Sequence, residues 1–205
     1  MFTYMILLSY ENAEKLFLKK KYRFFKSEYN LNIFAIRAAS RKINEFDDTL
    51  CVAYEENKEK KIFYAPCTVD PGLPWLLAPM EPKMGAAAVK EGQYLSVWEL
   101  GYFRRTPALL QVGVFVCYRD NDKNEVFDYE SSKTSAGIYG IHLHEHFQPQ
   151  ETATKVDKSS AGCIVPASRK DFYALIALCR KQEACGWGRR FSFTLFDEKE
   201  IQTCL

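Results

Sequence analysis

The 205-residue sequence has no excess of charge of either sign, because 28 lysines and arginines are balanced by 26 aspartates and glutamates. The net charge is therefore only +2. Proteins that bind polyanions rely on clustered cations, so nucleic acid is the least favoured partner. Internal repeats and low-complexity tracts are also missing. With 47% hydrophobic and 15% aromatic residues, the chain can bury a substantial core, which excludes disorder.

Cysteine pairs of the CxxC type are absent as well. The seven cysteines are an odd number, which suits neither a zinc knuckle nor a fully paired disulfide framework and favours synthesis in a reducing compartment. The apolar stretch 1–10 lacks a basic leading region, and charged residues from Glu11 onward end it too soon for a secretory signal or a membrane span. We therefore expect a protein made in the cytoplasm without a signal peptide or a membrane span.

The first third of the sequence predicts a helix followed by a β meander. Residues 11–26 are helix formers, with aromatic residues that can build one buried face. Strand-like segments rich in β-branched and aromatic residues follow at 32–37, 49–54 and 61–65, with a charged hairpin tip at 55–60. We expect residues 1–30 to form a helical appendage and residues 31–205 to form the main, catalytic domain.

The rest of the chain indicates further β structure and one more helix. Turn residues concentrate between Asp70 and Pro82 and predict a long irregular loop. Ser168 can cap a helix whose apolar residues have helical spacing. The remaining strands are expected at 93–100, 112–118, 137–147 and 191–196. The predicted fold class is mainly β, a sandwich or partly open barrel, with one or two peripheral α-helices.

Two short segments contain the residues with the clearest chemistry. All three histidines lie in residues 140–146 at alternate positions, and a strand there would point His142, His144 and His146 to the same side. The second segment, residues 159–166, contains Cys163 directly after Gly162. A thiol needs a base at neutral pH, and an imidazole within hydrogen-bond reach supplies one while lowering the thiol pKa.

Gly162 matters because a glycine before the nucleophile lets the backbone turn sharply and leaves space for a substrate carbonyl. Backbone N–H groups near such a turn can form an oxyanion hole. The pattern therefore predicts a cysteine nucleophile at Cys163 with a histidine base.

The two motifs, Gly140-Ile141-x-x-His144 and Ser160-x-Gly162-Cys163, resemble the signature of L,D-transpeptidase catalytic domains. The similarity extends over roughly residues 30–197 to uncharacterised bacterial and phage-encoded members of that superfamily, through Asp70-Pro71-Gly72, Gly92-Gln93-Tyr94 and Tyr118-Arg119-Asp120-Asn121. It departs from the family pattern at two positions. Ala161 replaces the usual histidine, and Val165 stands where many members carry Arg or Asn that helps to bind the donor peptide.

The resemblance implies a cysteine-dependent enzyme that acts on a peptidoglycan stem peptide or a similar peptide containing D-amino acids, without a cofactor. It assigns catalytic roles to Cys163, His144, His142, Gly162 and Ser160, with His144 the preferred base. It further implies that a main-chain carbonyl, at Glu145, holds the ring of that base. Substrate-binding positions are expected at Tyr139, Ala161 and Trp75. An enzyme without an export signal would reach the wall by lysis, in a phage particle or through a secretion apparatus.

Other interpretations of the same residues are open. His142, His144 and His146 could bind zinc with Glu145 or Cys163 and form a zinc hydrolase. Asp120, Asp122, Asn124 and Asp128 faintly resemble a calcium loop, but they lack its central glycine and its terminal glutamate, so a solvated hairpin turn is favoured. A third hypothesis is a non-catalytic protein that binds the cell wall or belongs to a phage particle and retains an idle cysteine.

Overall fold

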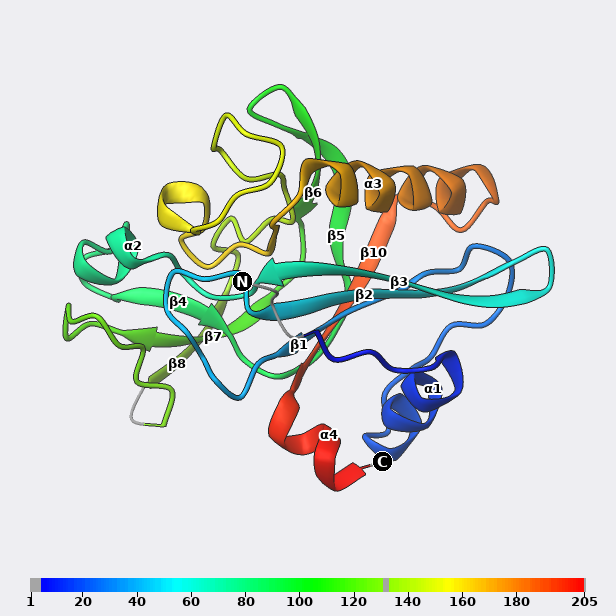
Figure 1. The fold of residues 1–205 in the computed structure, drawn as a ribbon, viewed down its shortest axis with the longest axis horizontal. Helices are drawn as coiled ribbons and strands as arrows, with labels where there is room; N and C mark the ends of the chain where they lie inside the picture. The colour runs from blue at the N-terminus through cyan, green and yellow to red at the C-terminus, as the bar shows by residue number, and fades with distance from the viewer. Residues whose placement is uncertain (1–4, 131–132, 205) are drawn as a thin grey trace.

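A seven-stranded sheet with the strand order β6-β5-β10-β1-β2-β3-β9 forms the centre of the computed structural model, which describes residues 5–130 and 133–204, the side chains of 202–204 excepted (Figure 1). A smaller sheet has the order β4-β7-β8. The strands of the large sheet are β1 Asn32–Arg37, β2 Asp48–Glu56, β3 Glu59–Thr68, β5 Gly92–Phe103, β6 Thr106–Gln111, β9 Val165–Pro166 and β10 Arg190–Asp197. Those of the small sheet are β4 Ala86–Val89, β7 Phe115–Asp120 and β8 Lys133–Gly137.

Strand β1 shows how both faces of the large sheet become buried. Its side chains alternate between faces. Ile33 and Ala35 belong to the larger core cluster, whereas Phe34 and Ile36 belong to a second cluster on the other face. All six residues of β1 are buried. This explains why residues 33–36 are all apolar, which is typical of a strand covered on both sides.

Helices cover the two faces of this sheet. In Figure 1, α3 (Arg169–Ala184) lies along the top of the sheet, and α1 (Tyr10–Lys19) and α4 (Glu198–Cys204) lie below it. As expected, Ser168 caps α3: its hydroxyl accepts a hydrogen bond from the Asp171 N–H. Strands account for 37% of the chain and helices for 19%, so the prediction of a mainly β fold is confirmed, as a curled sheet with a small second sheet.

The helices differ from the prediction in number and length. Four α-helices occur in the described residues, with α2 (Leu73–Leu77) inside the predicted irregular loop and α4 after the last strand. The first helix ends at Lys19, not at Lys26, because Lys20 caps it and Lys21 adopts a left-handed φ of 59°. Helix α1 packs on the sheet through Leu16 and Phe17, in the same cluster as Phe34. The proposed boundary at residue 30 stays a prediction.

Four strands, β4, β6, β8 and β9, were not predicted, and one segment was assigned wrongly. Strand β4 is Ala-Ala-Ala-Val, a sequence of low β propensity, and β6 contains Pro107, which is tolerated because β6 is the edge strand of its sheet. The expected strand 137–147 is not a regular strand, since only Leu143 forms isolated bridges there, to Leu109 and Ile164.

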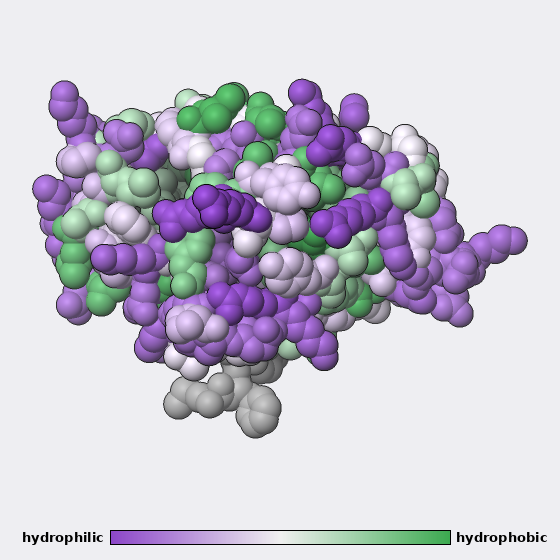
Figure 2. All heavy atoms as spheres, turned by 90° about the horizontal axis from the view of Figure 1, so that it is seen from above, coloured by the Kyte–Doolittle hydropathy of each residue, from purple (hydrophilic) through white to green (hydrophobic). Residues whose placement is uncertain are grey.

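Hydrophilic side chains dominate the face seen in Figure 2, including the projecting end of the β2–β3 hairpin, with hydrophobic side chains scattered among them. None of the helices in the described residues is both long enough and apolar enough to cross a membrane.

Candidate active site

The two motif segments lie side by side. Leu143 and Ile164 form a parallel bridge, with hydrogen bonds from the His144 N–H to the Ile164 carbonyl (3.2 Å) and from the Ile164 N–H to the His142 carbonyl (2.9 Å). Leu143 and Ile164 are fully buried in the larger core cluster. Because side chains alternate along extended backbone, the neighbouring His142, His144 and Cys163 side chains project away from that core.

These three side chains line a single cavity of about 630 Å³. The structure also places Tyr139, Ala161 and Trp75, the predicted substrate-binding residues, in its wall. Ser160 and Gly162 are not part of the lining, and they instead form the turn that carries Cys163. The rest of the wall combines apolar and charged side chains, namely Met80, Glu81, Met84, Ala86, Ala87, Phe103, Arg104, Arg119, Ile138, Ile141, Phe147, Lys158 and Ser159, with Gly85 and Gly140.

The turn before Cys163 is fixed by backbone contacts. Gly162 has a left-handed φ of +119°, and a Cβ added to it would lie 2.5 Å from the Ala87 carbonyl oxygen. The Ser160 side chain is fully buried. Its hydroxyl oxygen accepts from the Gly162 N–H at 3.1 Å and lies 3.0 Å and 2.8 Å from the carbonyl oxygens of Asp70 and Cys163. The predicted need for glycine is therefore explained by a steric contact across to β4.

A buried charge network supports the turn from behind. Asp70, whose carbonyl lies beside the Ser160 hydroxyl, pairs through its carboxylate with the fully buried Arg37 at 3.1 Å. Arg37 also pairs with Glu91 and donates to the Val89 carbonyl at 2.7 Å. Hydrogen bonds in several directions are what a buried guanidinium requires, and here they anchor the segment against which the turn rests.

The two histidines in the cavity have opposite tautomers. His144 Nδ1 lies 2.7 Å from the Glu145 carbonyl oxygen, so this nitrogen donates and Nε2 keeps its lone pair. The contact to Glu145 that the resemblance implied is thus confirmed. His142 Nδ1 instead accepts from the Gln111 N–H at 2.9 Å, which places the proton of a neutral ring on Nε2. His144 is consequently the ring with a basic nitrogen available.

Both members of the expected pair are neutral at rest. Burial lowers the pKa of His144 to about 4, with further lowering by His142 and Arg104 and an opposing effect of the Glu145 carbonyl. Burial raises the pKa of the Cys163 thiol to about 11. The expectation of a lowered thiol pKa is therefore wrong, because desolvation of the thiolate outweighs the one favourable contact, from the His142 backbone N–H.

The sulfur contacts backbone groups. Cys163 Sγ lies 3.4 Å from the His142 nitrogen, whose N–H points to it, and 3.5 Å from the Gly140 carbonyl oxygen. Within the described residues no imidazole nitrogen is hydrogen-bonded to this sulfur. The backbone N–H groups of Ala161 and Cys163 have no acceptor in that same part of the chain.

The third histidine lies elsewhere, which corrects the expectation that all three point the same way. His146 is buried outside the cavity lining, and its Nε2 lies 3.1 Å from the Glu151 carbonyl oxygen. Among the residues that the structure describes, the one converging group of three metal-ligating side chains contains only aspartates. The predicted zinc arrangement of histidines with Glu145 or Cys163 is therefore not formed there.

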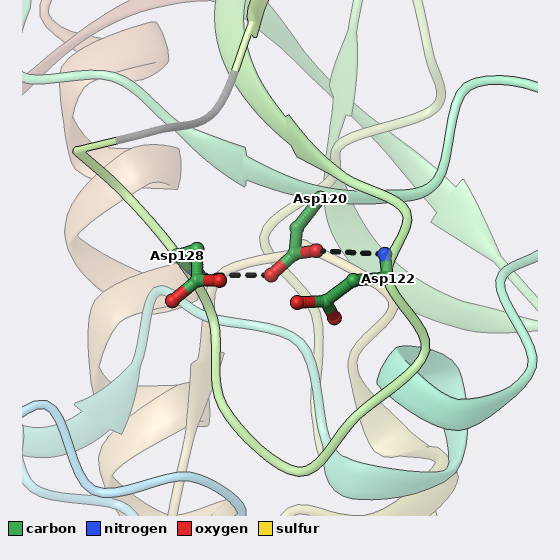
Figure 3. A group of neighbouring side chains, drawn as sticks. All are labelled: Asp120, Asp122 and Asp128. Atoms are coloured by element: carbon green, nitrogen blue, oxygen red, sulfur yellow. Dashed lines mark hydrogen bonds between the residues drawn. The ribbon is translucent and has the colours of Figure 1, made fainter.

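That aspartate group is Asp120, Asp122 and Asp128, whose carboxylate oxygens lie within 4.8 Å of one another (Figure 3). The Asp120 carboxylate accepts hydrogen bonds from the backbone N–H groups of Asp122 and Asp128 at 3.2 Å and 2.8 Å. These two bonds close the loop after β7. The three aspartates are therefore explained by a polar turn, which is the interpretation that the sequence favoured.

No model of a known protein family matches this chain, and no curated protein matches it. The resemblance to L,D-transpeptidases thus stays a prediction, based on its motifs.

Several residues around the cavity were not predicted. Gln111 orients the histidine segment: its Oε1 accepts from the N–H groups of Tyr139 and Ile141, and its backbone N–H binds His142. Arg104 was not singled out, and Arg119, although part of the motif 118–121, was not predicted to line the cavity. A lone glutamine or arginine on a strand or in a hairpin turn gives no pattern in the sequence, so its role becomes visible only when distant strands are brought together.

Proposed function

We propose that the protein is a cysteine-dependent acyl-transfer enzyme of the L,D-transpeptidase type, acting on a peptidoglycan stem peptide. The observation that carries the proposal is the shared cavity of Cys163 and His144, in which Glu145 orients the imidazole so that Nε2 is the basic nitrogen. A nucleophile, a base and a group that orients the base are the recurring elements of such sites.

In the first half-reaction, the Cys163 sulfur attacks the carbonyl that joins an L to a D centre while His144 Nε2 takes the thiol proton. The carbonyl oxygen becomes an oxyanion, towards which the Ala161 and Cys163 N–H groups can donate. The carbon–nitrogen bond then breaks, and His144 returns the proton to the departing amine of the terminal D-residue. The product is a thioester on Cys163.

In the second half-reaction, an amine or a water molecule attacks the thioester, and His144 takes the proton of the nucleophile. The carbon–sulfur bond breaks and the thiol is restored. An amine yields a cross-link or an attached D-amino acid, whereas water yields carboxypeptidase or endopeptidase activity. The accessible cavity is compatible with either acceptor.

The neutral resting pair favours general-base catalysis over a preformed thiolate–imidazolium pair. With a thiol pKa of about 11 and an imidazole pKa of about 4, proton transfer must accompany the attack on the carbonyl. His142, protonated on Nε2, can donate a hydrogen bond into the same cavity.

The test is incubation with purified muropeptides, followed by mass spectrometry of products and of the intact protein. Wild type should release the terminal D-residue and carry a thioester adduct, and both signals should be lost in Cys163→Ala. His144→Ala should slow adduct formation by at least about a hundredfold, the usual contribution of a general base. Equal product formation by wild type and Cys163→Ala would refute the proposal. Binding without turnover, unaffected by Cys163→Ala, would indicate a binding protein instead.

A further inference from the structure

The cavity has an unbalanced charge. Its wall contains three cationic side chains, Arg104, Arg119 and Lys158, and a single acidic one, Glu81. None of the four forms a salt bridge with any other residue in the described part of the chain. Glu81 and Lys158 are exposed and therefore well solvated. An uncompensated positive cavity favours a ligand that carries negative charge.

Strand pairing brings Arg119 near the nucleophilic turn. Arg119 lies on β7, where its register partner across the antiparallel pair is Ala87 of β4. The Ala87 carbonyl is the group against which Gly162 packs. Paired residues on neighbouring strands lie only about 5 Å apart, so Arg119 is one strand away from the turn that presents Cys163.

The contacts of Arg119 fix its guanidinium and leave one end without a partner. Its Nε donates to the Ser135 hydroxyl at 2.9 Å, and its guanidinium carbon lies 4.1 Å from the centre of the Tyr139 ring. Its second terminal nitrogen, Nη2, is buried and has no hydrogen-bond partner. Because Nη2 is enclosed by protein, a ligand can reach the guanidinium only on the side of Arg119 that lines the cavity. A carboxylate satisfies a guanidinium better than any other common group.

We propose that Arg119 is a specificity-determining residue that binds a free carboxylate of the substrate peptide next to the scissile bond. The inference rests on the proposed function, because it concerns the ligand of the same cavity. Arg104, stacked 4.3 Å from the centre of the Phe147 ring at the rim, and Lys158 add longer-range attraction for an acidic peptide. Trp75, Met80 and Met84 supply an apolar wall for the rest of the peptide.

The carboxylate has more than one possible source, since it can belong to the departing D-residue or to the acyl donor that stays on the sulfur. The tetrapeptide L-Ala-γ-D-Glu-meso-diaminopimelate-D-Ala separates these sources, because each of its free carboxylates can be replaced by an amide in turn. Binding of each derivative to Cys163→Ala is measured by calorimetry, and thioester formation is measured with the otherwise wild-type protein.

Amidation of the carboxylate that Arg119 binds should weaken binding about tenfold to a hundredfold, the range for a charge-assisted hydrogen-bonded pair. The Arg119→Gln variant should bind the free-acid peptide more weakly than wild type by the same factor. It should bind the amidated peptide as tightly as wild type does. Arg119→Lys should recover only part of the loss, because lysine cannot bind bidentately. Arg180→Gln, on the exposed side of α3 and outside this cavity, removes the same charge and is the matched control.

The outcomes separate the two proposals. Absence of a thioester with every peptide would refute the proposed function. Thioester formation at equal rates with all derivatives, with Arg119→Gln like Arg180→Gln, would refute the role of Arg119 alone. If the Arg119→Gln variant does not fold, binding to the wild-type protein still tests the proposal. Tighter binding of the free acid than of the amide, and weaker binding of the free acid at high salt, would support it, and their absence would refute it.

Discussion

The Ala87 carbonyl oxygen lies where a side chain on Gly162 would have to go, 2.5 Å from the ideal Cβ position. Gly162→Ala should therefore combine a steric clash with a left-handed φ and cost about 2–4 kcal/mol of unfolding free energy. It should also abolish thioester formation, because the turn must move. Gly186→Ala is the control, since Gly186 has a φ of +86° but no atom within 4 Å of its Cβ position, and it should cost only about 1 kcal/mol. Equal denaturation midpoints for the two variants would contradict this account.

The pKa of His144 predicts the pH profile of acylation. Because burial holds this pKa at about 4, the base remains neutral and competent from pH 5 to 9. The rate of thioester formation should be nearly flat over this range and should halve near pH 4. Stopped-flow or quenched-flow mass spectrometry gives the rate. An acid limb near the ordinary histidine pKa of about 6.5 would show that His144 is not the base or is not buried as described.

The same pKa predicts a loss of stability in acid. An unfolded His144 binds its proton at about pH 6.5, whereas the folded protein resists protonation until about pH 4. Between these values the unfolded state holds more protons, so stability falls as pH falls, by on the order of 3 kcal/mol in total. Urea unfolding of wild type and His144→Gln at pH 7.5 and pH 4 should show this difference. If the two proteins differ in unfolding free energy by the same amount at both pH values, His144 does not cause the loss of stability in acid.

The raised thiol pKa predicts slow alkylation of Cys163. Iodoacetamide reacts with the thiolate, so the labelling rate should rise about tenfold per pH unit up to about pH 11. Exposed Cys185 should be labelled in the native protein and serves as the internal reference, with peptide mapping to separate the sites. His144→Ala should leave this profile almost unchanged. Rapid labelling near pH 7 that disappears in His144→Ala would instead indicate a preformed ion pair.

Ser160→Ala tests the support of the turn. The buried hydroxyl contacts the Gly162 N–H and lies beside the carbonyl oxygens of Asp70 and Cys163. Removing this hydroxyl should lower the free energy of unfolding by about 1–3 kcal/mol, because buried polar groups lose their hydrogen-bond partner. Ser168→Ala, which removes the N-cap of α3, should cost about 1 kcal/mol without affecting acylation. The two variants are compared by thermal unfolding and by the rate of adduct formation. A normal acylation rate in Ser160→Ala would argue against a role of Ser160 in positioning Cys163.

The elements with strong local signals were predicted well. The segments 32–37, 49–54 and 61–65 are within β1, β2 and β3, and α3 begins after its Ser168 cap. Such elements combine a clear hydrophobic period with turn or cap residues. Strand β4 and edge strand β6 were missed because alanine and proline disfavour strands, and only pairing with β7 and β5 makes them extended.

For the site, the sequence by itself determined which residues are chemically capable: a cysteine after a glycine, and histidines at alternate positions. Tertiary structure decided how they are used. The Leu143–Ile164 bridge brings His142, His144 and Cys163 to one cavity and leaves His146 outside it. Glu145 and Gln111 select the tautomers, burial sets both pKa values, and β7 adds Arg119 to the wall. These properties depend on groups that are distant in the chain and on exclusion of water, neither of which a local pattern of residues encodes.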